Sequence, residues 1–247
     1  LPFLFVSPVY SAAPAASVTR SHKIILEVPM RYPCLVLDHD DTLVRSTPEI
    51  HYPSFVETIR LLRPEMPAPT LREFITHSFD PGFLPMCRDV YRFTDEEMET
   101  EQEIWRRYTR RVPDCYEGFE RLLARYRAAG GKVCVVSHSE KRIILRDYLA
   151  HFGFEPDMVF GWELPEEKRK PHGYPLDAIM EALGLTPGDL LMVDDLRLGF
   201  DMARSRKVDF GWAGWSDTAF VTTEFMTENA LYCFSTPRGL EDFLMGE

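Results

Sequence analysis

Short apolar runs alternate with amphipathic segments along most of the chain. The first such run, residues 34–37 (Cys-Leu-Val-Leu), is apolar throughout, which is typical of a strand covered on both faces in a parallel sheet. Beyond residue 116 helix and strand patterns alternate, and this alternation predicts right-handed crossovers and a parallel α/β sheet. The predicted strands are residues 132–136, 158–160, 189–193, 208–213 and 231–234, and the predicted helices are residues 117–129, 140–151, 176–183, 199–206 and 240–245.

Residues 47–115 interrupt this alternation directly after the first strand. Apolar residues recur there at helical spacing. Thr70 and Thr94 are each followed three residues later by a glutamate, which is the pattern of a capping box at a helix start. We therefore expect an all-helical domain at residues 47–115, inserted into a discontinuous α/β core of residues 30–46 and 116–247.

Residues 1–29 differ in character from the rest of the chain. They lack the basic start and long apolar stretch of a signal peptide. The first residue is leucine, and Met30 lies just before the first predicted core strand. We expect the functional domain to begin near Met30, preceded by an extension of unclear role that could include a strand at residues 23–28. A targeting segment is the alternative.

Composition narrows the classes of partner. The 247 residues carry a formal net charge of −11, which disfavours nucleic acid as the main partner because such binding needs basic surface. No apolar run approaches the ~20 residues of a membrane-spanning helix. The five cysteines have no Cys-x-x-Cys or zinc-ligand spacing, so we expect buried thiols in a reducing, cytoplasmic setting and no membrane partner.

Carboxylates and a hydroxyl follow three of the predicted strands. Asp38 and Asp40 end the first, Ser137 follows the second, and Asp194 and Asp195 end a later one. Ligands bind at the carboxyl ends of strands in open α/β sheets, so these side chains are expected to meet. Carboxylates held close together repel unless a cation lies between them, and a hard divalent ion with oxygen ligands is the simplest candidate.

The order of these groups resembles the four motifs of the haloacid dehalogenase (HAD) superfamily. Asp38-His39-Asp40-Asp41-Thr42 is similar to the first motif, Ser137 to the second, Lys170-Pro171 to the third and Asp194-Asp195 to the fourth. The resemblance spans about residues 30–200. It implies a doubly wound, Rossmann-like parallel sheet with an inserted helical C1 cap, similar to phosphoglycolate phosphatase and β-phosphoglucomutase relatives.

The resemblance also implies roles for individual residues. Asp38 would be the nucleophile that becomes an aspartyl phosphate, and Asp40 the general acid and base. Ser137 would hold phosphoryl oxygens together with nearby backbone N–H groups. Lys170 would neutralise Asp38 and the phosphoryl group. A plain helix cap is the alternative for Ser137, and a solvated surface charge is the alternative for Lys170.

A Mg²⁺ ion is the implied cofactor. Asp38, Asp195 and the backbone carbonyl of Asp40 would be its direct ligands, and Asp194 would act through water or an outer contact. His138 is a further candidate contact for the substrate phosphate, with a core or surface role as the alternative.

Several other polar or aromatic residues are given no catalytic role by the sequence. His39 should point away from the cleft and pack. The tryptophans Trp162, Trp212 and Trp215 are expected to pack in the core or at its rim. Arg45 and His51 could face the cleft at the hinge.

These features predict a Mg²⁺-dependent phosphatase acting on a small phosphorylated metabolite. Residues 46–131 contain no lysine for a Schiff base, which argues against a phosphonate-cleaving relative, and the presence of Asp40 argues against a dehalogenase. A sugar phosphomutase stays open as an alternative. So does a catalytically silent phosphometabolite-binding or regulatory protein, whose one support is Asp41 at the position usually held by glycine.

Overall fold

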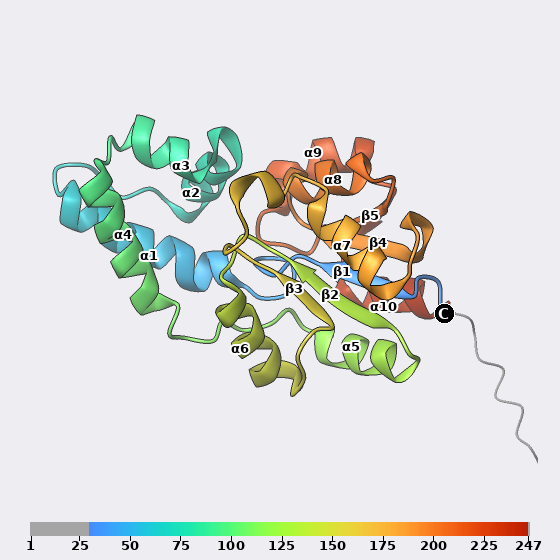
Figure 1. Ribbon diagram of the computed structural model, residues 1–247. Coiled ribbons are helices and arrows are strands. Elements are labelled where there is room, and N and C mark those ends of the chain that lie inside the picture. Colours follow the sequence, from blue (N-terminus) through green and yellow to red (C-terminus); the bar gives the residue numbers. More distant parts are fainter. Residues whose placement is uncertain (1–29, 247) are drawn as a thin grey trace, which may run out of the picture.

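The computed structural model describes residues 30–246 (Figure 1). The proposed extension of residues 1–29, with its expected strand at residues 23–28, lies outside this range. None of the helices in the described range combines the length and the apolar character that a membrane span requires.

A six-stranded parallel sheet forms the core, in the order β3-β2-β1-β4-β5-β6. The sequence predicted all six strands to within one residue at each end. They are β1 (Cys34–Leu37), β2 (Lys132–Val136), β3 (Met158–Phe160), β4 (Leu190–Asp194), β5 (Asp209–Ala213) and β6 (Tyr232–Phe234). Because β1 lies in the middle, its carboxyl end is flanked by those of β2 and β4.

Helices cover both faces of the sheet (Figure 1). The core helices are α5 (Phe119–Ala128), α6 (Lys141–Phe152), α7 (Tyr174–Leu183), α8 (Arg197–Ser205), α9 (Ala219–Asn229) and α10 (Pro237–Met245), with short turns η4 (Glu166–Lys168) and η5 (Pro187–Asp189). Alternate residues of β1 serve opposite layers: Leu35 and Leu37 pack with α5, α6 and α10, and Cys34 and Val36 pack with α7, α8 and α9. Both layers bury apolar surface, as expected for a doubly wound fold.

The sequence did not predict α9. Its threonines, glutamates and phenylalanines show no clear apolar stripe, and only Thr222 and Met226 are buried. Contact with the rest of the fold, rather than its own periodicity, therefore holds this segment as a helix.

The segment after β1 is helical, as predicted, and forms the cap. Its helices are α1 (Tyr52–Leu62), α2 (Leu71–His77), α3 (Phe83–Pro85) and α4 (Asp95–Tyr108), with π-helical turns η1 (Thr47–His51), η2 (Ser78–Gly82) and η3 (Met86–Val90). Capping boxes form at Thr70 and Thr94, as the sequence predicts. A separate aromatic cluster around Phe55, Phe74 and Tyr91 forms the cap interior.

Two connections join cap and core side by side. Val44 pairs with Cys115 in an antiparallel bridge. The Arg45 N–H donates to the Asp114 carbonyl at 2.8 Å, and the Tyr116 N–H donates to the Leu43 carbonyl at 3.0 Å. This paired crossing resembles a two-stranded hinge. The domain limits given above, residues 47–115 for the cap, stay a prediction.

Candidate active site

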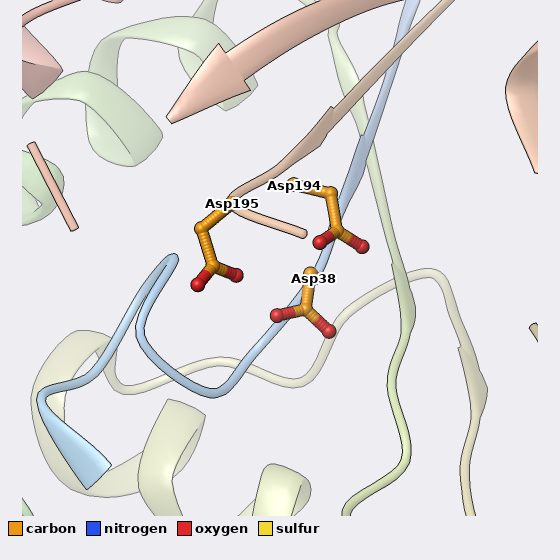
Figure 2. Close-up of side chains that lie close together, drawn as sticks. All are labelled: Asp38, Asp194 and Asp195. Carbon is orange, nitrogen blue, oxygen red and sulfur yellow. The ribbon is translucent and has the colours of Figure 1, made fainter. Parts of the chain in front are cut away.

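Three carboxylates from two neighbouring strands converge at the carboxyl edge of the sheet (Figure 2). Asp38 follows β1, Asp194 ends β4, and Asp195 follows it. One oxygen from each can be chosen so that all lie within 4.8 Å of one another, and all three side chains are buried. The parallel pairing of Leu37 with Val193 brings the two segments together.

The start of α8 packs directly on this cluster. A methyl group added at Gly199 would lie 2.2 Å from Asp194 Oδ2. This close packing explains why no side chain fits at position 199.

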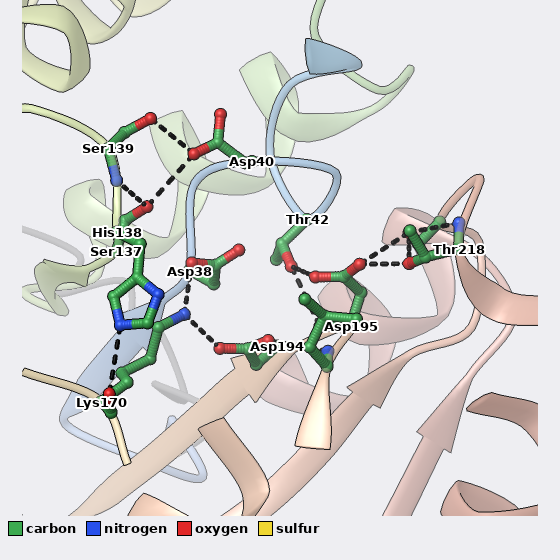
Figure 3. Close-up of polar contacts among 12 residues, drawn as sticks. Asp38, Asp40, Thr42, Ser137, His138, Ser139, Lys170, Asp194, Asp195 and Thr218 are labelled. Atoms are coloured by element: carbon green, nitrogen blue, oxygen red, sulfur yellow. Dashed lines mark hydrogen bonds and ion pairs between the residues drawn. The ribbon is translucent and has the colours of Figure 1, made fainter. Parts of the chain in front are cut away.

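Lys170 lies between two of these carboxylates (Figure 3). Its Nζ is 2.6 Å from Asp38 Oδ1 and 2.7 Å from Asp194 Oδ2, and its side chain is 5% exposed. The alternative of a solvated surface charge is therefore wrong. Burial alone would lower the pKa of Lys170, but Asp194 and Asp38 outweigh it and raise the pKa above its usual value. The lysine thus stays charged and brings a positive charge to the candidate nucleophile.

Asp195 is held by three hydroxyl groups (Figure 3). Thr42 Oγ1 donates to Asp195 Oδ1 at 3.1 Å, Ser216 Oγ donates to Oδ2 at 3.1 Å, and Thr218 Oγ1 also donates to Oδ2. Trp215 in turn donates from its indole to the Thr42 carbonyl at 3.0 Å. The loop after β5 therefore fixes the orientation of this carboxylate.

The carboxylate cluster carries more negative charge than Lys170 can balance. Burial, followed by repulsion from Asp38, raises the pKa of Asp195 to about 7. Burial likewise raises the pKa of Asp194, despite the attraction of Lys170. A divalent cation among the oxygens would relieve this repulsion, and all-oxygen donors suit Mg²⁺. The residues therefore fit the predicted ion.

Asp40 faces a different set of partners from Asp38. Ser139 Oγ donates to Asp40 Oδ2 at 2.5 Å, and Ser137 Oγ lies 3.4 Å from the same oxygen. His51 Nε2 lies 3.4 Å from Oδ1. The side chain of Asp40 is thus absent from the three-carboxylate cluster. The predicted metal contact through the backbone carbonyl of Asp40 stays a prediction.

Hydrogen bonds decide the charge of Asp40. Burial would raise its pKa, but the hydrogen bond from His51, with smaller contributions that include Ser139, brings the pKa below its usual value. The lowered pKa favours the ionised form of Asp40 in this arrangement. An approaching phosphoryl group is an anion and would raise the pKa again.

Asp41 replaces glycine at a left-handed position. Its φ is +55°, a conformation that glycine adopts without cost and that aspartate tolerates better than most residues. The side chain is buried, and its Oδ1 accepts the Thr47 N–H at 3.2 Å. Burial and the nearby Asp195 raise the pKa of Asp41. Aspartate is thus accommodated in the left-handed conformation of this turn.

The two histidines near the catalytic motifs differ in position. His39 is 1% exposed, and its Nε2 lies 3.1 Å from Asp147 on α6, so it packs away from the cleft as predicted. His138 lies beside Lys170, with its Nε2 3.1 Å from the Lys170 carbonyl (Figure 3). Its role in substrate binding stays a prediction.

Three hydroxyl residues of the site were not predicted: Ser139, Ser216 and Thr218. The sequence could have predicted Ser139, because it lies two residues after Ser137 and two residues along an extended chain place side chains on the same side. Ser216 and Thr218 follow β5, which had no recognisable motif, and only the fold brings them to Asp195.

The comparisons with known proteins agree with this geometry. The family model for haloacid dehalogenase-like hydrolases matches residues 32–205. The chain belongs to this hydrolase family. No curated protein matches the sequence.

Solved structures of HAD hydrolases share the fold. A predicted phosphoglycolate phosphatase from Haemophilus somnus 129PT has a TM-score of 0.67 at 18% identity, covering 87% of this chain and 97% of that one. A haloacid dehalogenase-like family hydrolase from Streptococcus pneumoniae has a TM-score of 0.65 at 15% identity, covering 86% and 98%. A HAD-superfamily hydrolase of subfamily IA from Geobacter sulfurreducens PCA has a TM-score of 0.59 at 16% identity, covering 87% and 97%. At these identities the likeness establishes the fold.

Proposed function

We propose that the protein is a Mg²⁺-dependent phosphatase that hydrolyses a small phosphorylated metabolite through an aspartyl phosphate on Asp38. The observation that carries this proposal is the contact of Lys170 Nζ with Asp38 Oδ1 at 2.6 Å, inside the cluster formed with Asp194 and Asp195. The description of one structural neighbour as a predicted phosphoglycolate phosphatase supports the same class of reaction.

Asp38 would form the covalent bond in the first step. One of its carboxylate oxygens attacks phosphorus, and the bond from phosphorus to the ester oxygen breaks. Asp40, protonated once the substrate has bound, gives its proton to the leaving oxygen, so that an alcohol departs rather than an alkoxide. Lys170 and the hydroxyl of Ser137 would stabilise charge on the phosphoryl oxygens.

Water would release the phosphate in the second step. Asp40, now ionised, takes a proton from the water as its oxygen attacks phosphorus. The bond between phosphorus and Asp38 breaks, which frees inorganic phosphate and restores the carboxylate.

Asp38 and Asp195 would hold the metal directly, and Asp194 would support it while paired with Lys170. When bound, Mg²⁺ supplies positive charge that lets an anionic ester approach an anionic nucleophile. Thr42, together with the hydroxyls of the loop after β5, would keep Asp195 oriented toward the ion.

The cysteines support a reducing, cytoplasmic setting for this activity. All five are free, including Cys34 and Cys134, whose sulfurs lie 3.9 Å apart without a bond.

Hydrolysis of p-nitrophenyl phosphate with Mg²⁺ or with EDTA tests the proposal. We expect turnover that requires Mg²⁺ and that Asp38→Asn or Asp195→Asn lowers by at least about a thousandfold. Asp201→Asn is the matched control, because Asp201 pairs with Arg197 on the surface of α8. Full activity in Asp38→Asn would refute the mechanism, and binding without turnover would favour a silent binding protein.

A further inference from the structure

Three side chains beside the phosphoryl site have no part in the proposed chemistry: His138, Trp162 and Arg169. Trp162 follows β3, and its backbone N–H donates to the Ser139 carbonyl at 2.9 Å. A methyl group at the preceding Gly161 would lie 2.8 Å from that same carbonyl oxygen. The absence of a side chain at Gly161 thus lets Trp162 approach the loop that carries the hydroxyls on Asp40.

These side chains pack on one another. The Arg169 guanidinium carbon lies 3.9 Å from the ring centroid of Trp162, a cation–π contact. The ring of His138 meets Trp162 at 81° with 6.0 Å between centroids. His138 Nε2 also contacts the Lys170 carbonyl. The group is therefore continuous with the phosphoryl site and is held in place before any ligand binds.

In the described part of the chain, Arg169 has no carboxylate partner. Within residues 30–246 its guanidinium forms no ion pair with a carboxylate, and its Nε is buried without a hydrogen-bond acceptor. A buried donor without a partner costs about 1–3 kcal/mol. In a chain with a net charge of −11, an unpaired arginine next to the catalytic lysine is suited to an anion brought by the ligand.

We propose that Arg169, fixed by Trp162 and His138, is a second anion subsite that selects substrates whose leaving group carries a carboxylate or a further phosphate. This inference rests on the phosphatase function proposed above and deepens it. Arg169 already covers Trp162, and His138 packs against the same ring, so a cation rather than a bare aromatic surface meets the ligand. A charged leaving group is therefore favoured over a stacked nucleobase.

Calorimetric binding to protein with Asp38→Asn tests the subsite without turnover. The probes are phosphoglycolate, fructose 1,6-bisphosphate, ethyl phosphate and AMP. We expect phosphoglycolate or the bisphosphate to bind at least about tenfold more tightly than ethyl phosphate, as an additional charge-assisted pair predicts. Which of the two binds better distinguishes a carboxylate from a phosphate.

Arg169→Gln in the same Asp38→Asn protein should bring the ratio of affinities, doubly charged ester over ethyl phosphate, most of the way back to one. Trp162→Leu should lower it too, because the guanidinium loses its support, and this second variant covers the case in which the first fails to fold. Lys168→Gln is the matched control, since Lys168 is an exposed neighbouring cation that lies over Tyr174 instead. The control should keep the ratio.

Equal affinity for all esters, tightest binding of AMP, or a ratio that survives Arg169→Gln would overturn the subsite. Failure of the phosphatase proposal gives a different result. If protein with Asp38 intact hydrolyses none of the esters yet the ratio persists and depends on Arg169, then the subsite is supported and the enzymatic function alone is refuted.

Discussion

Trp105 on cap helix α4 donates a hydrogen bond from its indole Nε1 to Nδ1 of His51, at 3.0 Å. An indole N–H can only donate, so Nδ1 of His51 must accept and carries no proton. The ring proton therefore sits on Nε2, which faces Asp40 Oδ1 at 3.4 Å. A side chain of the cap thus determines which nitrogen meets the candidate general acid and base.

This geometry predicts that loss of His51 affects proton transfer more than phosphoryl transfer. His51→Leu should lower kcat for an alkyl phosphate by at least about tenfold more than for p-nitrophenyl phosphate, because a nitrophenolate leaves without a proton. Steady-state rates on both esters measure the difference. His172→Leu is the control, since His172 is exposed on the loop before α7. Equal losses on the two esters would contradict this role.

A buried carboxyl in the cap predicts how stability varies with pH. Glu101 on α4 is 5% exposed, and burial raises its pKa to about 7 from 4.5. Between these values the unfolded chain loses the proton first, so the folded state binds more protons and stability falls as pH rises from about 4.5 to about 7. The full cost is at most roughly 3 kcal/mol.

Glu101→Gln removes that titration. We expect the melting temperature of the variant to exceed that of the unchanged protein at pH 8, and the gap to shrink at pH 5. Glu103→Gln, on the exposed side of the same helix, is the control and should show no such pH dependence. If the difference in melting temperature between the variant and the unchanged protein is the same at both pH values, then titration of Glu101 does not affect stability.

The turn at Asp41 predicts an order of stability among variants. Asp41→Gly and Asp41→Ala both lose the carboxylate and its bond to Thr47, but only alanine is strained at a φ of +55°. The glycine variant should therefore be more stable by about 1 kcal/mol. Urea unfolding of the two variants measures this difference, and equal stability would mean that the turn changes shape.

The sequence predicted the sheet and the meeting of carboxylates at its carboxyl edge because both follow from local patterns. The buried run before Asp38 and the paired acids after β4 each mark a strand end, and parallel pairing brings such ends to one edge. Lys170 contacts Asp38 and Asp194, although its neighbours in the sequence, Glu166 to Arg169, have the composition of an ordinary surface run.

Other features depend on contacts between distant segments. The helix α9 shows no periodic pattern, and Ser216 and Thr218 reach Asp195 only because β5 pairs with β4. His51 was a candidate for the cleft, but its bond to Trp105, 54 residues later, needs the packing of η1 on α4. Packing of this kind leaves no signal in a single chain.

The central claim is that Asp38 is the residue that accepts the phosphoryl group. Protein with Asp40→Asn, in which release of phosphate is slowed, can be mixed with p-nitrophenyl phosphate and Mg²⁺, quenched in acid and reduced with borohydride, which converts an aspartyl phosphate to homoserine. Peptide mass spectrometry should then find homoserine at position 38 and none in protein that also carries Asp38→Asn. Two results would contradict the account: turnover while position 38 stays aspartate after reduction, or homoserine at position 194 or 195.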